Sequence, residues 1–235
     1  MATNELSQSQ RGEYSENGTG FVRSAHGHLE ALNAAAAKPD PSDLHHIAKE
    51  AARSGNVAAL KYAISLGAEP SRMILPALSI DNPDSLVCLL DAGLDVNYRI
   101  PGYTGTPLTG SAAFAKVELI KALLSHGADP NLENCGWGQF QLKPIAAAAQ
   151  GLSKDKDAAE AIKALLEGGA KWEGSAALQL AAKHGKLECV KLLVGRGADV
   201  GEIVTKVEEQ GALKLAEERG ADEVASVLRE HGAKV

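Results

Sequence analysis

The side chains capable of chemistry are few and far apart in this sequence. Cys135 lies in a loop, but no matching His or Asn pattern accompanies it, as a cysteine nucleophile requires. His45 and His46 are adjacent, yet no further ligand follows at a metal-binding spacing. Cys88 and Cys189 are widely separated and lie within apolar patterns, where cysteine acts as a small hydrophobic residue. The sequence therefore predicts no enzyme: no catalytic residue, no metal site and no cofactor.

Two polar segments also lack a chemical signature. Residues 154–157 alternate Lys and Asp, with too few carboxylates for a calcium loop, and Asp157 is the expected N-cap of a helix from Ala158. The glycines at 102 and 105 follow no strand, so they indicate no phosphate-binding loop. These segments read as loops that connect regular elements.

The elements that remain form a repeat. Each unit has two short apolar helical patterns and ends on a glycine, most often in a Gly-Ala-Asp run. Two clear copies span residues 105–129 and 174–199. The closing glycine recurs at intervals of 26–42 residues, at Gly67, Gly93, Gly127, Gly169, Gly197 and Gly232. One such unit cannot bury its own apolar side, so the units must stack into a solenoid.

The average interval and the run Thr106-Pro107-Leu108 resemble the ankyrin repeat. Thr106 can cap the first helix, and the missing N–H of Pro107 costs nothing in a first turn. Gly185 suits the turn between the two helices. The resemblance covers about six units in residues 42–235 and implies an all-α ankyrin-repeat solenoid of stacked helix-turn-helix units with loop fingers.

Several units depart from the pattern. Pro76 falls inside the first helix of the second unit, so that helix must start late or kink. Ala115 replaces the turn glycine of the third unit. The last unit is polar, as the end of a solenoid requires, and the unit from Leu44 to Pro70 is the expected N-terminal cap.

Composition limits the classes of partner and the cellular compartments expected for this domain. The chain has 235 residues, 45% of them hydrophobic, and a formal net charge of −6 with no basic stripe, which argues against nucleic acid and membrane partners. Residues 1–41 are expected to be a disordered or weakly helical tail. Widely spaced cysteines and the lack of an apolar leader indicate the cytoplasm or nucleus.

Partners of ankyrin repeats bind the concave face formed by the first helices and the fingers, so the resemblance implies a protein or peptide partner there. Loop aromatics agree with this expectation, because rings are common interface anchors, although they can equally pack on one another. The candidate partner-binding residues are Tyr98, Arg99, Tyr103, Phe114, Trp137, Phe140, Gln150, Trp172, Lys183 and His184.

Two other hypotheses stay open. In the first, loops 97–105 and 131–142 close a pocket that holds a small molecule or an unusual active site. In the second, the chain has a structural role as an oligomer, although a monomer is the leading expectation. An enclosed cavity under these loops would favour the first, and light scattering tests the second.

Overall fold

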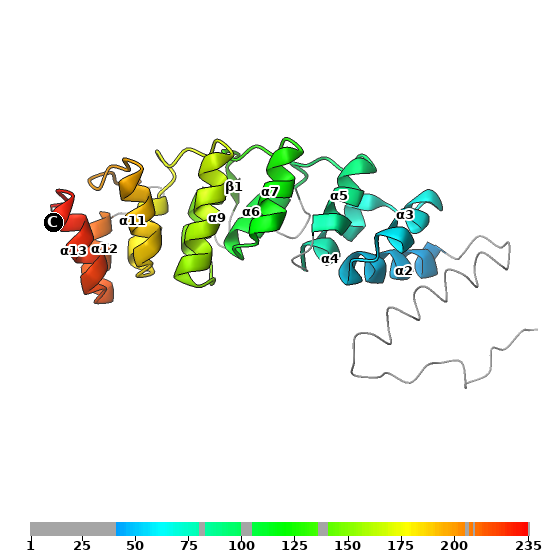
Figure 1. Cartoon of the computed structure of the whole chain (residues 1–235), viewed down its shortest axis with the longest axis horizontal. Helices are drawn as coiled ribbons and strands as arrows, with labels where there is room; N and C mark the ends of the chain where they lie inside the picture. The colour runs from blue at the N-terminus through cyan, green and yellow to red at the C-terminus, as the bar shows by residue number, and fades with distance from the viewer. Residues whose placement is uncertain are drawn as a thin grey trace, which may run out of the picture.

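The computed structural model describes residues 41–79, 83–99, 105–135, 141–204, 207–208 and 210–234. Within these ranges the chain folds into six consecutive helix pairs, which form one row in Figure 1. The first helices are α2 (Pro41–Ser54), α4 (Ile74–Ser79), α6 (Pro107–Ala113), α8 (Pro144–Gln150), α10 (Ala177–Lys183) and α12 (Ala212–Arg219). The second helices are α3 (Val57–Ser65), α5 (Pro83–Asp91), α7 (Val117–Ser125), α9 (Asp155–Glu167), α11 (Leu187–Gly195) and α13 (Asp222–Glu230). The predicted all-α solenoid is confirmed.

The core lies between the pairs rather than at one centre. First helices pack on first helices and second helices on second helices, which gives two layers along the row (Figure 1). Five of the six second helices bury a leucine completely four residues before the closing glycine, namely Leu89, Leu123, Leu165, Leu193 and Leu228, and in α3 the same place holds the buried Ala63. Burying such a side chain contributes about 1.5–3 kcal/mol. Stability therefore comes from contacts between neighbouring units.

Small residues let the first helices approach closely. Alanines with no exposed surface occupy the inner side of five of these helices: Ala51, Ala77, Ala148, Ala181 and Ala216. In α6 the same place holds Ser111, which is 2% exposed and whose hydroxyl has no hydrogen-bond partner within the described residues.

The turn between the two helices of a pair needs a left-handed residue. Gly185 supplies it with φ +66°, as its sequence position predicts. Ala115 takes the same conformation with φ +51°, although its Cβ makes this backbone unfavourable. The third unit therefore carries strain at a position where the first, fifth and sixth units use Gly55, Gly185 and Gly220.

The sequence predicts a late start for the first helix of the second unit and an N-cap at Asp157 for the second helix of the fourth unit. A short 3₁₀ helix, η2 (Pro70–Met73), precedes α4, so Pro76 falls in the first turn of α4, where its missing N–H is harmless. The late start is thus confirmed. The N-cap prediction for Asp157 is wrong, because α9 already begins at Asp155 and the capping position is Lys154.

The fingers between units are tied to one another. A two-residue antiparallel ladder joins β1 (Asn134–Cys135) to β2 (Gln141–Leu142) in one finger. Asn97 Oδ1 accepts a hydrogen bond from the Asp129 amide at 3.0 Å, and Asn131 Oδ1 accepts one from the Lys171 amide at 2.8 Å. Each asparagine therefore fixes its own finger to the next one along the row.

Candidate protein interface

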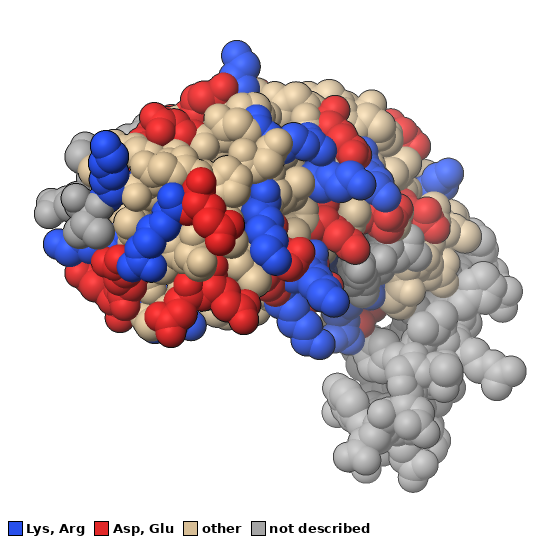
Figure 2. All heavy atoms as spheres, turned by 60° about the vertical axis from the view of Figure 1, so that its left-hand side comes forward, with Lys and Arg blue, Asp and Glu red and all other residues tan. Residues whose placement is uncertain are grey.

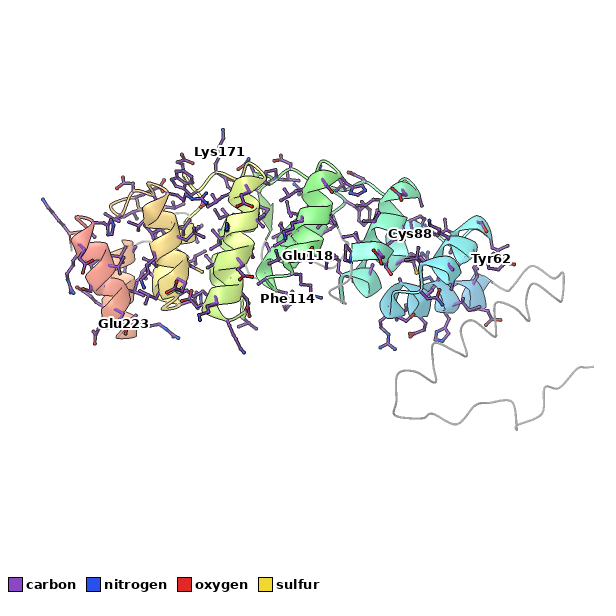
Figure 3. The ribbon with its side chains drawn as sticks, in the orientation of Figure 1. Tyr62, Cys88, Phe114, Glu118, Lys171 and Glu223 are labelled. Carbon is purple, nitrogen blue, oxygen red and sulfur yellow. The ribbon has the colours of Figure 1, made fainter. Side chains whose placement is uncertain are left out.

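The end of α6 presents an aromatic side chain to solvent. Thr106 Oγ1 accepts a hydrogen bond from the Thr109 amide at 3.3 Å and caps the helix start, as its sequence predicts. At the other end, the Phe114 amide donates to the Gly110 carbonyl at 3.3 Å. The Phe114 side chain is 47% exposed and points away from the helix in Figure 3. Its backbone is thus fixed while its ring stays accessible.

Two other predicted aromatics are half-buried and pack against the core, namely Tyr98 and Trp172. Their fingers use this packing for support. Arg99, next to Tyr98, is exposed. Tyr103, Trp137 and Phe140 lie outside the described residues.

An open cavity of about 450 Å³ lies beside Tyr98. Its lining combines charged and apolar side chains from the first three units: His45, Glu69, Ser71, Arg72, Ile74, Leu75 and Tyr98. Glu69 pairs with Arg72 at 3.1 Å, so the two charges partly compensate each other. The Ser71 hydroxyl and then the Arg72 guanidinium hold the pKa of Glu69 below its usual range.

Two lysines, the half-buried Lys116 and the buried Lys186, connect neighbouring units, a role that sequence reasoning missed. Lys116 Nζ donates to the Leu78 carbonyl at 2.6 Å, near the end of α4. Lys186 Nζ donates to the Gly151 carbonyl at 2.6 Å and to the Ala148 carbonyl at 3.3 Å, at the end of α8. A cation suits the carbonyl end of a helix. Both lysines follow the turn residue of their unit, and this shared place was the available signal.

Between the fourth and fifth units a carboxylate binds the amide start of a helix, whereas Lys186 binds the carbonyl end of one. Asp155 accepts hydrogen bonds from the Glu188 amide at 2.7 Å and the Cys189 amide at 3.1 Å, at the start of α11. Burial lowers the pKa of Lys186, and the Asp155 carboxylate opposes that shift. Asp155 therefore fixes the start of α11 against α9, while Lys186 fixes it against the end of α8.

The predicted polar pair at the end of α10 lies in a cationic environment. Lys183 is exposed and forms an ion pair with Glu208. Burial, and then the charges of Lys186, Arg219 and Lys183, lower the pKa of His184, while Glu208 opposes the shift. The half-buried imidazole is therefore neutral near pH 7. Gln150 is half-buried at the end of α8.

A buried amide that sequence reasoning missed holds the next finger. Gln179 is 2% exposed. Its Oε1 accepts from the Val204 amide at 2.8 Å, and its Nε2 donates to the Gln210 carbonyl at 2.8 Å. Aligning Ala177-Leu178-Gln179 with Pro107-Leu108-Thr109 places Gln179 at the residue after the shared leucine, which is the signal that could have found it.

Reactive groups do not gather within the described ranges. Burial raises the pKa of Cys88, and burial followed by the Asp155 charge raises the pKa of Cys189 far above its usual range. Both thiols are buried and therefore poor nucleophiles. The described residues contain no cluster of three or more His, Cys, Asp or Glu side chains placed to hold a metal. Nor does any described helix have the length and apolarity needed to cross a membrane.

Comparisons with known proteins agree with the geometry. A family model for ankyrin repeats in three copies matches residues 145–235, and a single ankyrin repeat model matches residues 105–135. The crystal structure of the human ASB11 ankyrin repeat domain superposes with a TM-score of 0.66 at 24% identity, covering 80% of this chain and 84% of that one.

A human ion channel protein, transient receptor potential cation channel subfamily A member 1, is 30% identical over 114 residues. The match spans 46% of this chain but only 9% of the channel protein. The matched repeats, the six stacked helix pairs and the shared fold show that this chain belongs to the ankyrin repeat family.

Proposed function

We propose that this chain is a non-enzymatic interaction module that binds a protein or peptide on its first-helix face, meaning the surface of the six first helices and the adjoining fingers. Ankyrin repeats generally mediate protein–protein interactions, and this face is their concave side. The observation that carries the proposal is the exposed Phe114 ring on a capped, well-packed helix end. Large rings in fixed positions are typical anchors of interfaces.

The fixed fingers support the same proposal. Asn97 and Asn131 tie consecutive fingers together, and Gln179 holds the finger that follows α11. A surface that is already ordered loses little conformational entropy when a partner binds. Tyr98 and Trp172 contribute mainly as supports, since both rings pack on the core. Arg99, Gln150, Lys183 and His184 are the polar residues proposed to contact the partner.

The test compares proteins captured from cell lysate by the wild-type chain, by Phe114→Ala and by Tyr62→Leu. Tyr62 is a half-buried ring on α3, in the second-helix layer (Figure 3), and serves as the matched control. Phe114→Ala should weaken capture of the same protein by about 1–3 kcal/mol while its melting temperature hardly changes. Equal capture by all three proteins would contradict the role of Phe114, and no enriched protein would contradict the function.

The cavity beside Tyr98 favours a second candidate function, the binding of a small molecule. Its volume of about 450 Å³ lies within the usual range of ligand sites. An NMR fragment screen tests this candidate through the amide signals of Arg72, Leu75 and Tyr98. A fragment that shifts these signals, and no longer binds after Arg72→Ala, would support it. A screen without such fragments would reject it.

We also propose that the protein is a monomer in the cytoplasm or nucleus and that residues 42–235 form its folded domain. The two buried free thiols at Cys88 and Cys189 suit a reducing compartment. Light scattering should give the mass of a single chain, and imaging of a fluorescent fusion should show cytoplasmic or nuclear signal. A dimeric mass or a secreted fusion would contradict this part.

A further inference from the structure

The turn ends of the third and fourth units lie next to each other, and each carries an exposed apolar residue. A Cβ added to Gly151 would lie only 2.0 Å from the Ala113 carbonyl oxygen, so the two backbones touch there. Phe114 follows Ala113 and is 47% exposed, and Leu152 follows Gly151 and is 90% exposed. A leucine with so little cover is unusual on a well-packed turn. Leu152 is not among the candidate residues predicted from the sequence.

The same line of turns continues into a cationic region. Lys186 donates to the Gly151 carbonyl at 2.6 Å, so the turn of the fifth unit lies beside that of the fourth. Arg219 Nε lies 3.6 Å from the place a Cβ on Gly185 would occupy, next to His184. We name the line formed by Phe114, Leu152, His184 and Arg219 the turn row. It is apolar at one end and basic at the other.

The charges around His184 determine which chemical group the basic end of the turn row attracts. Lys183, Lys186 and Arg219 all act on the imidazole to disfavour its protonation, and Glu208 opposes them. Glu208 already pairs with Lys183, and Glu217 pairs with Arg229 on α13. Arg219 is exposed and forms no ion pair with a described residue. Although the chain is acidic overall and its charges are interspersed in Figure 2, this end of the turn row favours a carboxylate.

We propose that the turn row binds an extended segment of a partner protein, with a large apolar side chain over Phe114 and Leu152 and Asp or Glu side chains beside His184 and Arg219. This inference rests on the proposed function and names the chemistry of the partner. Packed helices lie about 8–10 Å apart, so three steps span about 24–30 Å. An extended chain rises about 3.3 Å per residue, so about 7–9 residues cover the row.

The experiment selects peptides of about 12 residues from an unbiased display library on the full chain, a length that exceeds the span of the row. Selected peptides should pair an apolar residue with a run of Asp and Glu. Their dissociation constants are then measured with the wild-type chain. Raising NaCl from about 0.05 M to about 0.5 M should weaken binding several-fold, because salt screens exposed charges.

Matched variants locate the binding. Lys183→Gln with Arg219→Gln should raise the dissociation constant about 3–30-fold. The control, Lys121→Gln with Lys191→Gln, removes the same charge from exposed sites on α7 and α11 and should leave binding unchanged.

Leu152→Asn should weaken binding about tenfold, as loss of a buried apolar contact does. Ile203→Asn is its control, because Ile203 is 48% exposed on a finger away from the turns.

The outcomes separate this inference from the proposed function. Peptides that lack acidic residues, or that bind both test variants normally, would overturn the turn row while leaving peptide binding intact. A selection that yields no binding peptide would overturn both. Acidic peptides that bind the control variants and lose affinity for the test variants would establish the inference.

Discussion

The contact between Gly151 and Ala113 makes a sharp test of how the units pack. Gly151 has φ −55° and ψ 162°, a backbone that alanine adopts easily, so Gly151→Ala introduces no backbone strain. Its only direct effect is a methyl group placed 2.0 Å from the Ala113 carbonyl oxygen. Ordinary carbon–oxygen contacts are about 3.3 Å or longer. The third and fourth units must therefore separate by about 1 Å or distort their backbones.

Substitutions at two other glycines give reference values for the expected change in the free energy of unfolding. At Gly195, the last residue of α11, an added Cβ meets nothing within 4 Å, so Gly195→Ala should stabilise the chain by about 0.4–1 kcal/mol through the unfolded state. At Gly168 the added Cβ meets the end of the Leu124 side chain at 2.5 Å, which can rotate away, so the net change should be within about 1 kcal/mol. Overpacking against backbone costs about 1–3 kcal/mol or more, so Gly151→Ala should lose about 2 kcal/mol net.

Guanidinium unfolding followed by far-UV circular dichroism measures the three variants against the wild-type chain. The expected order of stability is Gly195→Ala, then Gly168→Ala, then Gly151→Ala. The same shift should displace Leu152 from Phe114 and weaken selected peptides. If Gly151→Ala proves as stable as Gly195→Ala, the close approach of the two units is wrong, and the adjacency within the turn row loses its support.

Three further predictions concern stability. Ala115→Gly should raise the free energy of unfolding by about 0.5–1 kcal/mol, because it relieves a left-handed alanine at φ +51°; a loss in a thermal melt would contradict this. Lys186→Met should lower the free energy of unfolding by about 2 kcal/mol, because it leaves the Ala148 and Gly151 carbonyls without their cation. The control Lys191→Met, at an exposed site, should change it little. Equal losses in urea titrations would contradict a stabilising role for the bonds from Lys186 to these carbonyls. The pKa of His184 is lower in the folded state than in the unfolded state, so the unfolded state binds more protons and stability is lost as pH falls below about 6.5. His184→Gln should reduce the dependence of the melting temperature on pH across about pH 5–8. An unchanged pH dependence would exclude His184 as its source.

Local patterns in the sequence sufficed for the repeat architecture. The sequence predicts two short helices and a closing glycine in each unit, and the described residues form six such helix pairs, each followed by a glycine with positive φ. The missing turn glycine points to Ala115, which does adopt the left-handed backbone. These features are readable because they depend on residues a few positions apart, within one helix or one turn.

Features set by contacts between units could not be read in this way. The N-cap prediction for Asp157 failed, and Asp155 instead caps α11, which lies more than 30 residues further along the chain. Tyr98 and Trp172 occur in loops yet pack against the hydrophobic core, which a loop position alone does not reveal. Leu152 is not among the residues predicted from the sequence, and only the close backbone approach of Gly151 to Ala113 places its turn next to the turn that carries Phe114.

The most direct test of the central claim, that a partner binds the first-helix face, is hydrogen–deuterium exchange of the full chain with and without a selected peptide. Bound peptide should slow exchange at the ends of α6, α8 and α10 and in the turns that follow them, while the outer sides of α7, α9 and α11 exchange as before. Protection confined to the second helices, or no change along the chain at saturating peptide, would contradict the account.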